Sequence, residues 1–156
     1  MTYIAPKTPA SLECIFCALP AVHRDEEHYI LYRGEHCFMM LNLYPYNPGH
    51  LMFAPYAHLN SLEKLDSATL AELMSQAQLA LRVLRSTMQP DGFNMGINEG
   101  KVAGAGFDGH MHLHIVPRWN GDTNFMPVLA DVKVIPEHIA STYQKIKEAL
   151  DTLANQ

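Results

Sequence analysis

Five short apolar runs, each bounded by turn-forming residues, predict β-strands along the chain. The first two are separated by Gly34-Glu35-His36, which predicts a hairpin, and the third follows the loop Tyr44-Pro-Tyr-Asn-Pro-Gly49. The last two flank a glycine-rich segment. The predicted strands span residues 28–33, 37–41, 51–54, 93–97 and 110–117.

Two longer segments carry apolar residues at the spacing of an α-helix. Asp66 or Ser67 can cap the first helix, and Pro90-Asp-Gly92 ends it. The second helix is expected to start at Pro136, a favourable first-turn residue. The apolar face of the first is predicted to hold Leu70, Leu73, Met74, Ala77, Leu81, Leu84 and Met88, and that of the second Ile139, Tyr143, Ile146, Leu150 and Leu153.

The order strands, helix, strands, helix predicts an α+β fold, with an antiparallel sheet of about five strands, one long central helix and a C-terminal helix. A chain of 156 residues has the length of one domain, so we expect a single domain over residues 1–156. Residues 1–12 are rich in Pro, Thr and Ser and are expected to form an extended arm. Residues 129–156 are expected to form a C-terminal helical segment.

Charge and hydropathy restrict the partners of the chain. The formal net charge of -5 argues against binding a nucleic-acid polymer, and a small phosphorylated ligand would need a local site. The sequence holds neither an apolar stretch of about eighteen residues nor a basic segment followed by an apolar run at its start. We therefore expect a cytoplasmic protein without a membrane partner.

Two of the three cysteines form the pair Cys14-Ile-Phe-Cys17. In a reducing compartment this spacing favours metal binding or redox work over a structural disulfide. The alternative is a pair of buried thiols or a reversible disulfide. The pair needs further ligands before it can be interpreted.

The segment His110-Met-His112-Leu-His114 alternates histidine with apolar residues. Because strand side chains point to opposite faces in turn, the apolar residues are expected to enter the core while the three imidazoles share the other face. A strand whose polar residues face water is the alternative. On a strand rising about 3.3 Å per residue, His110 and His114 lie roughly 13 Å apart. Two nitrogens on one zinc ion must lie within about 4 Å, so the three cannot form a metal site of their own, although one can join other ligands.

A histidine-rich segment that follows a glycine-rich loop is a candidate site for a reaction at a phosphate group. Glycines such as Gly104 and Gly106 let backbone N–H groups approach and bind an anion. A neutral imidazole can attack phosphorus, and neighbouring imidazoles can donate protons. The middle histidine, His112, is flanked by groups that can hold its tautomer and contact the leaving oxygen. We therefore predict a nucleotidyl hydrolase or transferase with His112 as nucleophile.

The run His110-Met-His-Leu-His-Ile-Val116 resembles, at every position, the signature of the histidine triad (HIT) superfamily, His-φ-His-φ-His-φ-φ with φ apolar. The resemblance extends over about residues 12–128 and includes Asn42-Leu-Tyr-Pro-Tyr-Asn-Pro-Gly-His50, Pro55-Tyr-Ala-His58 and Pro117-Arg-Trp119, with Asn124-Phe125 after it. It is strongest with the bacterial diadenosine tetraphosphate phosphorylase (ATP adenylyltransferase) branch. The resemblance implies a HIT-like fold and a homodimer.

The resemblance also implies roles for single residues. His112 forms the nucleotidyl intermediate, His114 contacts the phosphate or the departing group, and the backbone around His110 orients the nucleophile. The implied nucleotide-binding residues are Asn42 for the ribose hydroxyls, Asn98 for the phosphate region, and Phe16 and Leu43 on either side of the base.

Bacterial relatives with an early Cys-x-x-Cys hold a structural zinc ion, which implies the ligands Cys14, Cys17, His58 and His110. Such a closed set leaves no position for catalysis, so the zinc would be structural and would fix His110. His50 is a competing ligand, but its place after a glycine favours capping or bridging a turn.

The chain departs from its relatives just before the triad. They often place Ser or Gln there, where the side chain touches the phosphates, and this chain has Gly104-Ala-Gly-Phe-Asp-Gly109. Backbone N–H groups must then provide more of the contacts to the phosphates. Lys101 or Arg118 can compensate, and a solvated surface charge is the alternative for each.

The leading prediction is an enzyme that cleaves a dinucleoside polyphosphate of the diadenosine tetraphosphate type, with inorganic phosphate or water accepting the nucleotidyl group from His112. An adenine nucleotide is thus the expected substrate. The alternatives are an adenosine phosphoramidate hydrolase, a nucleotide-binding scaffold with little activity, and a zinc-stabilised interaction module.

Overall fold

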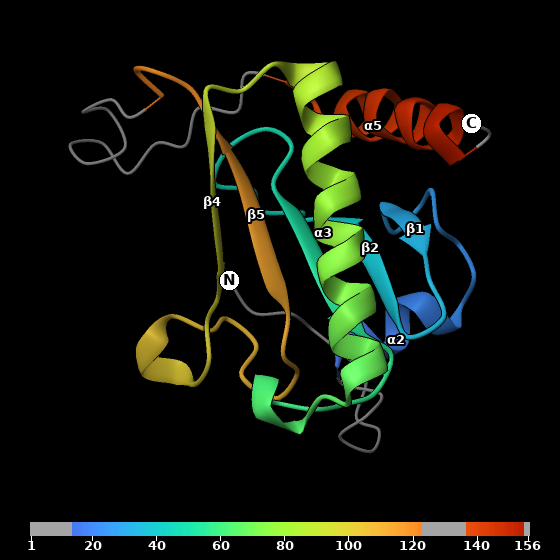
Figure 1. Ribbon diagram of the computed structural model, residues 1–156, viewed down its shortest axis with the longest axis vertical. Coiled ribbons are helices and arrows are strands. Elements are labelled where there is room, and N and C mark those ends of the chain that lie inside the picture. Colours follow the sequence, from blue (N-terminus) through green and yellow to red (C-terminus); the bar gives the residue numbers. More distant parts are fainter. Residues whose placement is uncertain (1–13, 123–136, 155–156) are drawn as a thin grey trace.

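The computed structural model describes residues 14–122 and 137–154, and an antiparallel five-stranded sheet forms the centre of this part of the chain (Figure 1). The strand order is β1-β2-β3-β5-β4, so β1 and β4 are the edges. With the long central helix and the C-terminal helix, the sheet confirms the predicted α+β fold. The strands are β1 (Ile30–Arg33), β2 (Cys37–Leu41), β3 (Leu51–Pro55), β4 (Gly92–Ile97) and β5 (Leu113–Arg118).

Different helices cover the two faces of the sheet. Met39 and Leu41 of β2 belong to the larger core, which includes residues of α3 (Ser67–Met88) and α5 (Ile139–Ala154). Phe38 and Met40 point to the opposite face and join a smaller core with α2 (Ile15–Ala21). We call these the α3 face and the α2 face. In Figure 1, α3 crosses the front of the sheet and α2 lies behind it.

Helix α3 has the predicted bounds, and one of the two predicted caps is present. The Asp66 carboxylate accepts a hydrogen bond from the Thr69 N–H at 2.8 Å. The chain leaves the helix at Gln89, whose φ of 49° lies in the left-handed region.

The predicted apolar face of α3 is partly wrong. Leu73, Ala77 and Leu84 are buried as expected, whereas Leu70 and Met74 are 41% and 48% exposed. The buried stripe passes instead through Ala80 and the polar residues Thr69 and Gln76, because the helix crosses the sheet and keeps only one narrow side against it.

Helix α5 starts at Ile139, three positions after the predicted start. His138 caps the start of the helix, because its carbonyl accepts the N–H groups of Ser141 and Thr142, and its Nδ1 accepts the N–H of Ala140. The arm predicted at 1–12, the residues Asn124-Phe125, and residue 136 itself lie outside the described residues.

Helix α2 has no counterpart among the predicted elements. It has seven residues with Pro20 among them, and only Phe16 and Pro20 are buried, so no helical period can be detected in the sequence. Two 3₁₀ turns, Leu62–Lys64 and Lys101–Ala103, complete the described elements.

Strand β5 begins at Leu113, not at the predicted residue 110. Its pairing with both β3 and β4 ends at Leu113, because the chain beyond β4 departs into the glycine-rich loop. The backbone N–H of Met111 donates instead to the Leu59 carbonyl, at 2.6 Å. Two of the three histidines therefore precede the strand.

None of the described helices is long and apolar enough to span a bilayer.

Candidate functional site

The three histidines of the triad segment lie on the α2 face, but they do not form an even row. His110 and His112 are 1% and 5% exposed, and half-buried His114 lies opposite Met52 of β3. The ring centroids of His112 and His114 are 4.7 Å apart. The Phe16 ring contacts both His112 and His110, with centroid distances of 4.5 Å and 5.4 Å. Each histidine has its own set of partners.

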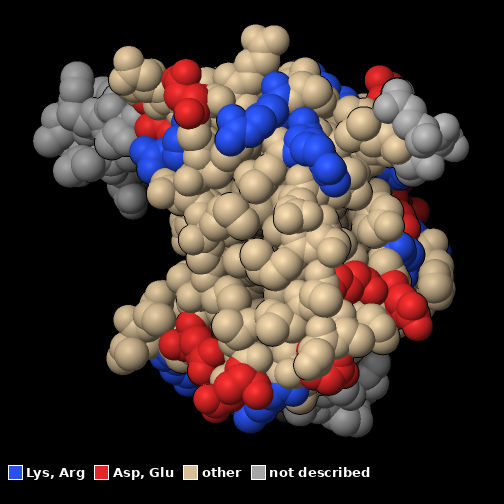
Figure 2. Space-filling model, in the orientation of Figure 1, with Lys and Arg blue, Asp and Glu red and all other residues tan. Residues whose placement is uncertain are grey.

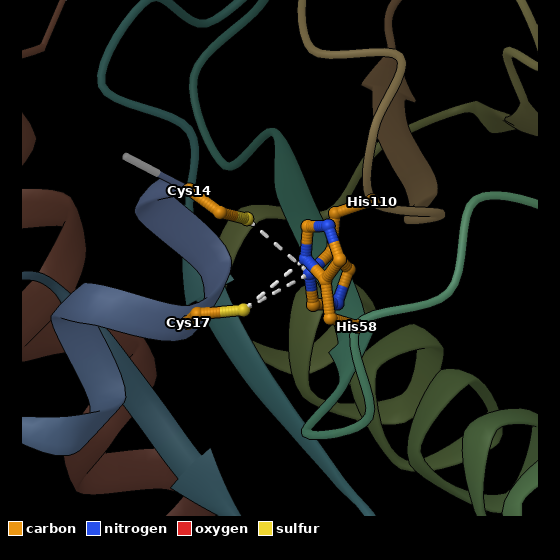
Figure 3. A group of neighbouring side chains, drawn as sticks. All are labelled: Cys14, Cys17, His58 and His110. Atoms are coloured by element: carbon orange, nitrogen blue, oxygen red, sulfur yellow. Dashed lines mark hydrogen bonds between the residues drawn. The ribbon is translucent and has the colours of Figure 1, made fainter. Parts of the chain in front are cut away.

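His110 joins a group of four side chains that can hold a metal ion (Figure 3). The ligand atoms of Cys14, Cys17, His58 and His110 all lie within 4.8 Å of one another. Cys14 and Cys17 come from the start of α2 and point toward the two imidazoles. The structure thus brings together all four residues that the sequence indicated for the metal site.

The distances within this group match a tetrahedral centre. The Cys14 and Cys17 sulfurs lie 3.3 Å and 3.6 Å from Nδ1 of His110, and the Cys17 sulfur lies 3.3 Å from Nδ1 of His58. Zinc–sulfur and zinc–nitrogen bonds of about 2.3 and 2.1 Å at a tetrahedral angle place sulfur and nitrogen roughly 3.6 Å apart. Two thiolates and two imidazoles are also the donor types that zinc prefers.

The protonation of His110 suits a metal ligand. Its Nε2 lies 2.9 Å from the Pro55 carbonyl, and since a carbonyl can only accept, Nε2 carries the hydrogen and Nδ1 has a free lone pair toward the cysteines. Burial lowers the pKa of His110 to about 4, which keeps the ring neutral, and burial raises the pKa of the Cys14 thiol to about 11. A thiolate at this buried position needs a cation beside it.

His112 has a fixed tautomer for a similar reason. Its Nδ1 donates a hydrogen bond of 2.9 Å to the carbonyl of His110, so Nε2 is the unprotonated nitrogen. Burial lowers the pKa of His112 and favours the neutral ring at neutral pH. The side chain therefore combines the two properties that a nucleophilic imidazole requires, a free lone pair and a held orientation.

His114 is held by His50, which is fully buried at the end of the loop before β3. The backbone N–H of Tyr46 donates to Nδ1 of His50, at 3.1 Å. Nε2 of His50 therefore carries a hydrogen and donates to Nδ1 of His114, at 2.9 Å. This leaves Nε2 of His114 as the donor nitrogen. Burial lowers the pKa of His114 to about 4, so this ring is also neutral.

The loop 42–50 carries two further residues of the predicted site. Asn42 is half-buried, and its Oδ1 accepts the Tyr44 N–H at 2.9 Å while its Nδ2 lies 3.4 Å from Nδ1 of His50. Leu43 beside it is 47% exposed. Both line a cavity of about 400 Å³ whose other wall is the start of α5. Gly49 has a φ of 77°, and a Cβ there would meet the Met88 sulfur at 2.6 Å, so the loop needs glycine at this position.

The remaining predicted nucleotide contacts lie on or near the glycine-rich loop. Asn98 reaches across the loop, with Nδ2 3.5 Å from the carbonyl of Gly104. Gly104 has a φ of 86°, and a Cβ on Gly106 would meet no atom within 4 Å. Phe16, in contrast, is only 1% exposed and its ring rests on His112.

The two cations that the sequence offers as phosphate ligands differ in their surroundings. The Arg118 guanidinium donates to both carboxylate oxygens of Asp122 and to Oδ1 of Asn94. Lys101 has a side chain that is 84% exposed, and its Nζ lies 4.0 Å from Asp108. Arg118 is thus committed to contacts within the protein.

Two side-chain contacts within the site were not predicted from the sequence. His50 does cap a turn, as predicted, but its contact with His114 joins residues far apart in the chain, and no local pattern encodes it. The stacking of Phe16 on His112 likewise depends on a helix that the sequence did not predict. A histidine directly after Pro-Gly and before a buried strand was the one available signal for His50.

Comparisons with known proteins agree with this geometry. The family model for the HIT domain matches residues 23–121. The AP-4-A phosphorylase of Mycobacterium tuberculosis is 44% identical over 137 residues, which cover 88% of this chain and 70% of that protein.

Two solved structures have the same fold. A Zn-bound histidine triad family protein from Mycobacterium smegmatis superposes with a TM-score of 0.74 at 27% identity, over 94% of this chain and 99% of that one. A hypothetical histidine triad nucleotide-binding protein from Sulfolobus tokodaii gives a TM-score of 0.71 at 28% identity, over 90% and 93%.

Proposed function

Since this chain belongs to the HIT family, we propose that it cleaves a dinucleoside polyphosphate of the diadenosine tetraphosphate type through a nucleotidyl intermediate on His112. The main support is the fixed tautomer of His112, whose Nδ1 is engaged by the His110 carbonyl. The similarity to a mycobacterial AP-4-A phosphorylase supports the substrate class.

In the first step, the lone pair on Nε2 of His112 forms a bond to the α-phosphorus while the bond from phosphorus to the bridging oxygen breaks. The departing oxygen leaves as a phosphate anion and accepts a hydrogen bond from the Nε2–H of His114, the last donor in the series of hydrogen bonds that begins at the Tyr46 N–H. His50 supports this role because it holds Nδ1 of His114 as an acceptor.

In the second step, phosphate or water attacks the same phosphorus and the N–P bond breaks, which restores neutral His112. A proton lost by the attacking water or phosphate passes to solvent, because Nδ1 of His114 already accepts from His50 and Nε2 already carries a hydrogen. With phosphate the product is a nucleoside diphosphate, and with water it is a monophosphate.

The nucleotide contacts are proposed from family resemblance and exposure. Asn42 and Leu43 would bind the ribose and the base, with Phe16 behind them. Asn98 and the backbone of the loop that contains Gly104 and Gly106 would bind the phosphates. Because Arg118 is paired with Asp122, Lys101 is the better of the two candidate cations for the polyphosphate chain.

Steady-state kinetics on diadenosine tetraphosphate, with and without phosphate, test the proposal. We expect turnover and a nucleotidyl group on His112 that mass spectrometry detects after rapid quenching. Nucleotide binding without turnover would instead support a nucleotide-binding scaffold. Faster turnover of an adenosine phosphoramidate would support the phosphoramidate hydrolase.

We also propose that the Cys14, Cys17, His58 and His110 group binds zinc. The donor set and the sulfur–nitrogen distances support it, and a Zn-bound structure is among the similar proteins. A closed set of four ligands gives the ion a structural role. Metal analysis should find one zinc ion per chain, lost in Cys17→Ser and retained in Cys37→Ser, whose thiol lies in β2 outside the group. A metal-free wild type would refute this site.

A second copy of the chain is the proposed partner of the exposed β4 edge. Leu70 and Met74 of α3 and Met95 of β4 are exposed apolar residues, and Met95 shares a strand face with Phe93 and Ile97, which are partly buried against the core. Figure 2 shows that the middle of this side of the molecule is largely uncharged, with charged side chains above and below it.

Sedimentation should show a dimer that Met95→Asp dissociates. Val22→Asp, at an exposed apolar residue beside α2, is the control and should leave the dimer intact. A monomeric wild type would refute the dimer.

A further inference from the structure

The metal group and the proposed nucleophile are joined by one aromatic side chain. Phe16 lies between Cys14 and Cys17 at the start of α2, so one helical turn carries both cysteines and this ring. The ring is 1% exposed and packs nearly parallel to the His112 ring, with 4.5 Å between centroids and 29° between planes. It also contacts the His110 ring, at 5.4 Å.

The first turn of α2 depends on contacts beyond the helix itself. Seven residues are too few for a helix to be stable alone. The far end is held by Arg33, which donates to the Pro20 carbonyl and to Asp25. At the near end, both cysteines lie within 3.6 Å of imidazole nitrogens of the metal group. The contacts of both cysteines with the metal group thus help to hold the turn that carries Phe16.

The orientation of His112 needs more than its hydrogen bond. The bond from Nδ1 to the His110 carbonyl fixes one atom of the ring, and the ring can still tilt about it. His114 contacts the ring at 69° to its plane, whereas Phe16 covers one of its faces. The Phe16 ring therefore restricts the tilt of the His112 ring, and with it the direction of the Nε2 lone pair.

We propose that Phe16 is a positioning residue that transmits metal occupancy to His112: an ion held by Cys14 and Cys17 keeps the Phe16 ring against the imidazole and so aims Nε2 at phosphorus. The inference rests on the proposed nucleophilic role of His112. It gives the metal group an effect on the rate of the chemical step although no substrate atom reaches the ion.

The first test compares two phenylalanine variants. Phe16→Leu keeps an apolar side chain and removes the flat face. Phe38→Leu is the matched control, because Phe38 is equally buried in the same small core and stacks on Tyr56, at 5.4 Å and 25°. We expect both variants to lower the melting temperature to a similar extent. Only Phe16→Leu should lower kcat, by about 10- to 100-fold. Because Phe16 is also a proposed base contact, KM can rise as well, but a rise in KM without a fall in kcat would overturn the positioning role.

The second test combines the substitution with metal removal. Chelation should lower kcat of the wild type by a factor similar to that of Phe16→Leu, and it should lower kcat of Phe16→Leu little further, because both changes release the same ring contact. Independent, multiplying effects of chelation and substitution would overturn the proposal, and so would a Phe16→Leu enzyme with the kcat of the wild type.

The third test does not depend on turnover. Protons on the His112 ring lie over an aromatic face, so their NMR signals should be shifted to high field in the zinc-loaded wild type. The shift should disappear in Phe16→Leu and on chelation, and persist in Phe38→Leu. A shift that survives chelation would refute the coupling.

The NMR result separates the two proposals. If the wild type does not turn over diadenosine tetraphosphate, the proposed function fails, while the ring-current shift still decides whether metal occupancy positions His112. If Phe16→Leu does not fold, Phe16→Met replaces it, since methionine also lacks a flat face.

Discussion

The two faces of the sheet are built on different principles. On the α3 face, two amphipathic helices cover an apolar core in which residues such as Phe53, Leu84 and Ile146 are fully buried. On the α2 face, one short helix covers a smaller core, and buried histidines replace apolar residues beside it. Each of these histidines has at least one ring nitrogen directed by a backbone group or by another histidine. The comparison indicates that the α3 face supplies stability, and that the α2 face uses buried polar groups for geometry.

The largest expected effect is on the α2 face. His112→Asn should lower kcat by at least about 10³-fold, because an asparagine amide cannot form the N–P bond. The unfolding free energy should change little, since the asparagine amide can still donate to the His110 carbonyl. Kinetics and urea unfolding measure the two quantities. A variant with a tenth of the wild-type kcat would exclude His112 as the nucleophile.

The reciprocal change on the α3 face should separate stability from activity. Leu84→Ala removes a fully buried side chain and should lower the unfolding free energy by about 2–5 kcal/mol. The kcat of the folded enzyme should stay within twofold of the wild type. Leu153→Ala, at a residue that is 37% exposed, is the control and should change stability by less than about 0.5 kcal/mol. A large loss of kcat in Leu84→Ala would mean that the faces are coupled.

His50→Gln tests the partner of His114. Loss of the donor to Nδ1 of His114 should lower kcat by about 10²-fold with little change in KM, because His114 would no longer be held in the donor tautomer. His23→Gln, at an exposed histidine, should behave as the wild type. Equal kcat values for His50→Gln and the wild type would remove His50 from the site.

The smallest effect is a pH dependence that the buried histidines of the α2 face should produce just below pH 6.5, above the range in which the carboxylates titrate. The folded-state pKa of His114 is about 4, against an ordinary value of 6.5, so between these values the unfolded chain binds a proton that the folded chain does not. The unfolding free energy should therefore be fully retained above pH 6.5 and fall as the pH drops toward 4.

Urea unfolding between pH 7 and 4.5 measures this slope. The slope should be smaller in His114→Asn and unchanged in Leu84→Ala. In the same way, kcat should stay constant from pH 8 to 6.5 and decline only below that range, because burial lowers the pKa of His112. An acid limb centred above pH 6.5 would contradict the neutral, buried imidazole.

The sequence predicted most of the fold because most of its elements are periodic. Helix α3 was predicted to the residue from the spacing of its apolar positions and its Asp66 cap. Helix α2 was missed because a seven-residue helix with Pro20 shows no period. The start of β5 was misplaced because Met111 bonds to Leu59 outside the sheet, which a local pattern cannot reveal.

In the candidate site, too, some residues were predicted from the sequence and others depend on tertiary contacts. Cys14, Cys17, His58 and His110 were indicated as one group, and the structure brings their ligand atoms together. The partners of His114 and His112, which are His50 and Phe16, depend on the tertiary packing of segments 64 and 96 positions away from them. Residue type and spacing identify the reactive groups, whereas their orientation is a property of the folded chain.

The hydrogen bond from the Tyr46 N–H determines which atom donates and which accepts in the series of hydrogen bonds that runs through His50 to His114. A backbone amide has no second tautomer and does not titrate near neutral pH, so it cannot exchange the roles of donor and acceptor. Free imidazole interconverts between two tautomers. In this protein the peptide backbone selects one of them two rings away, and the selection holds at every pH at which both rings stay neutral.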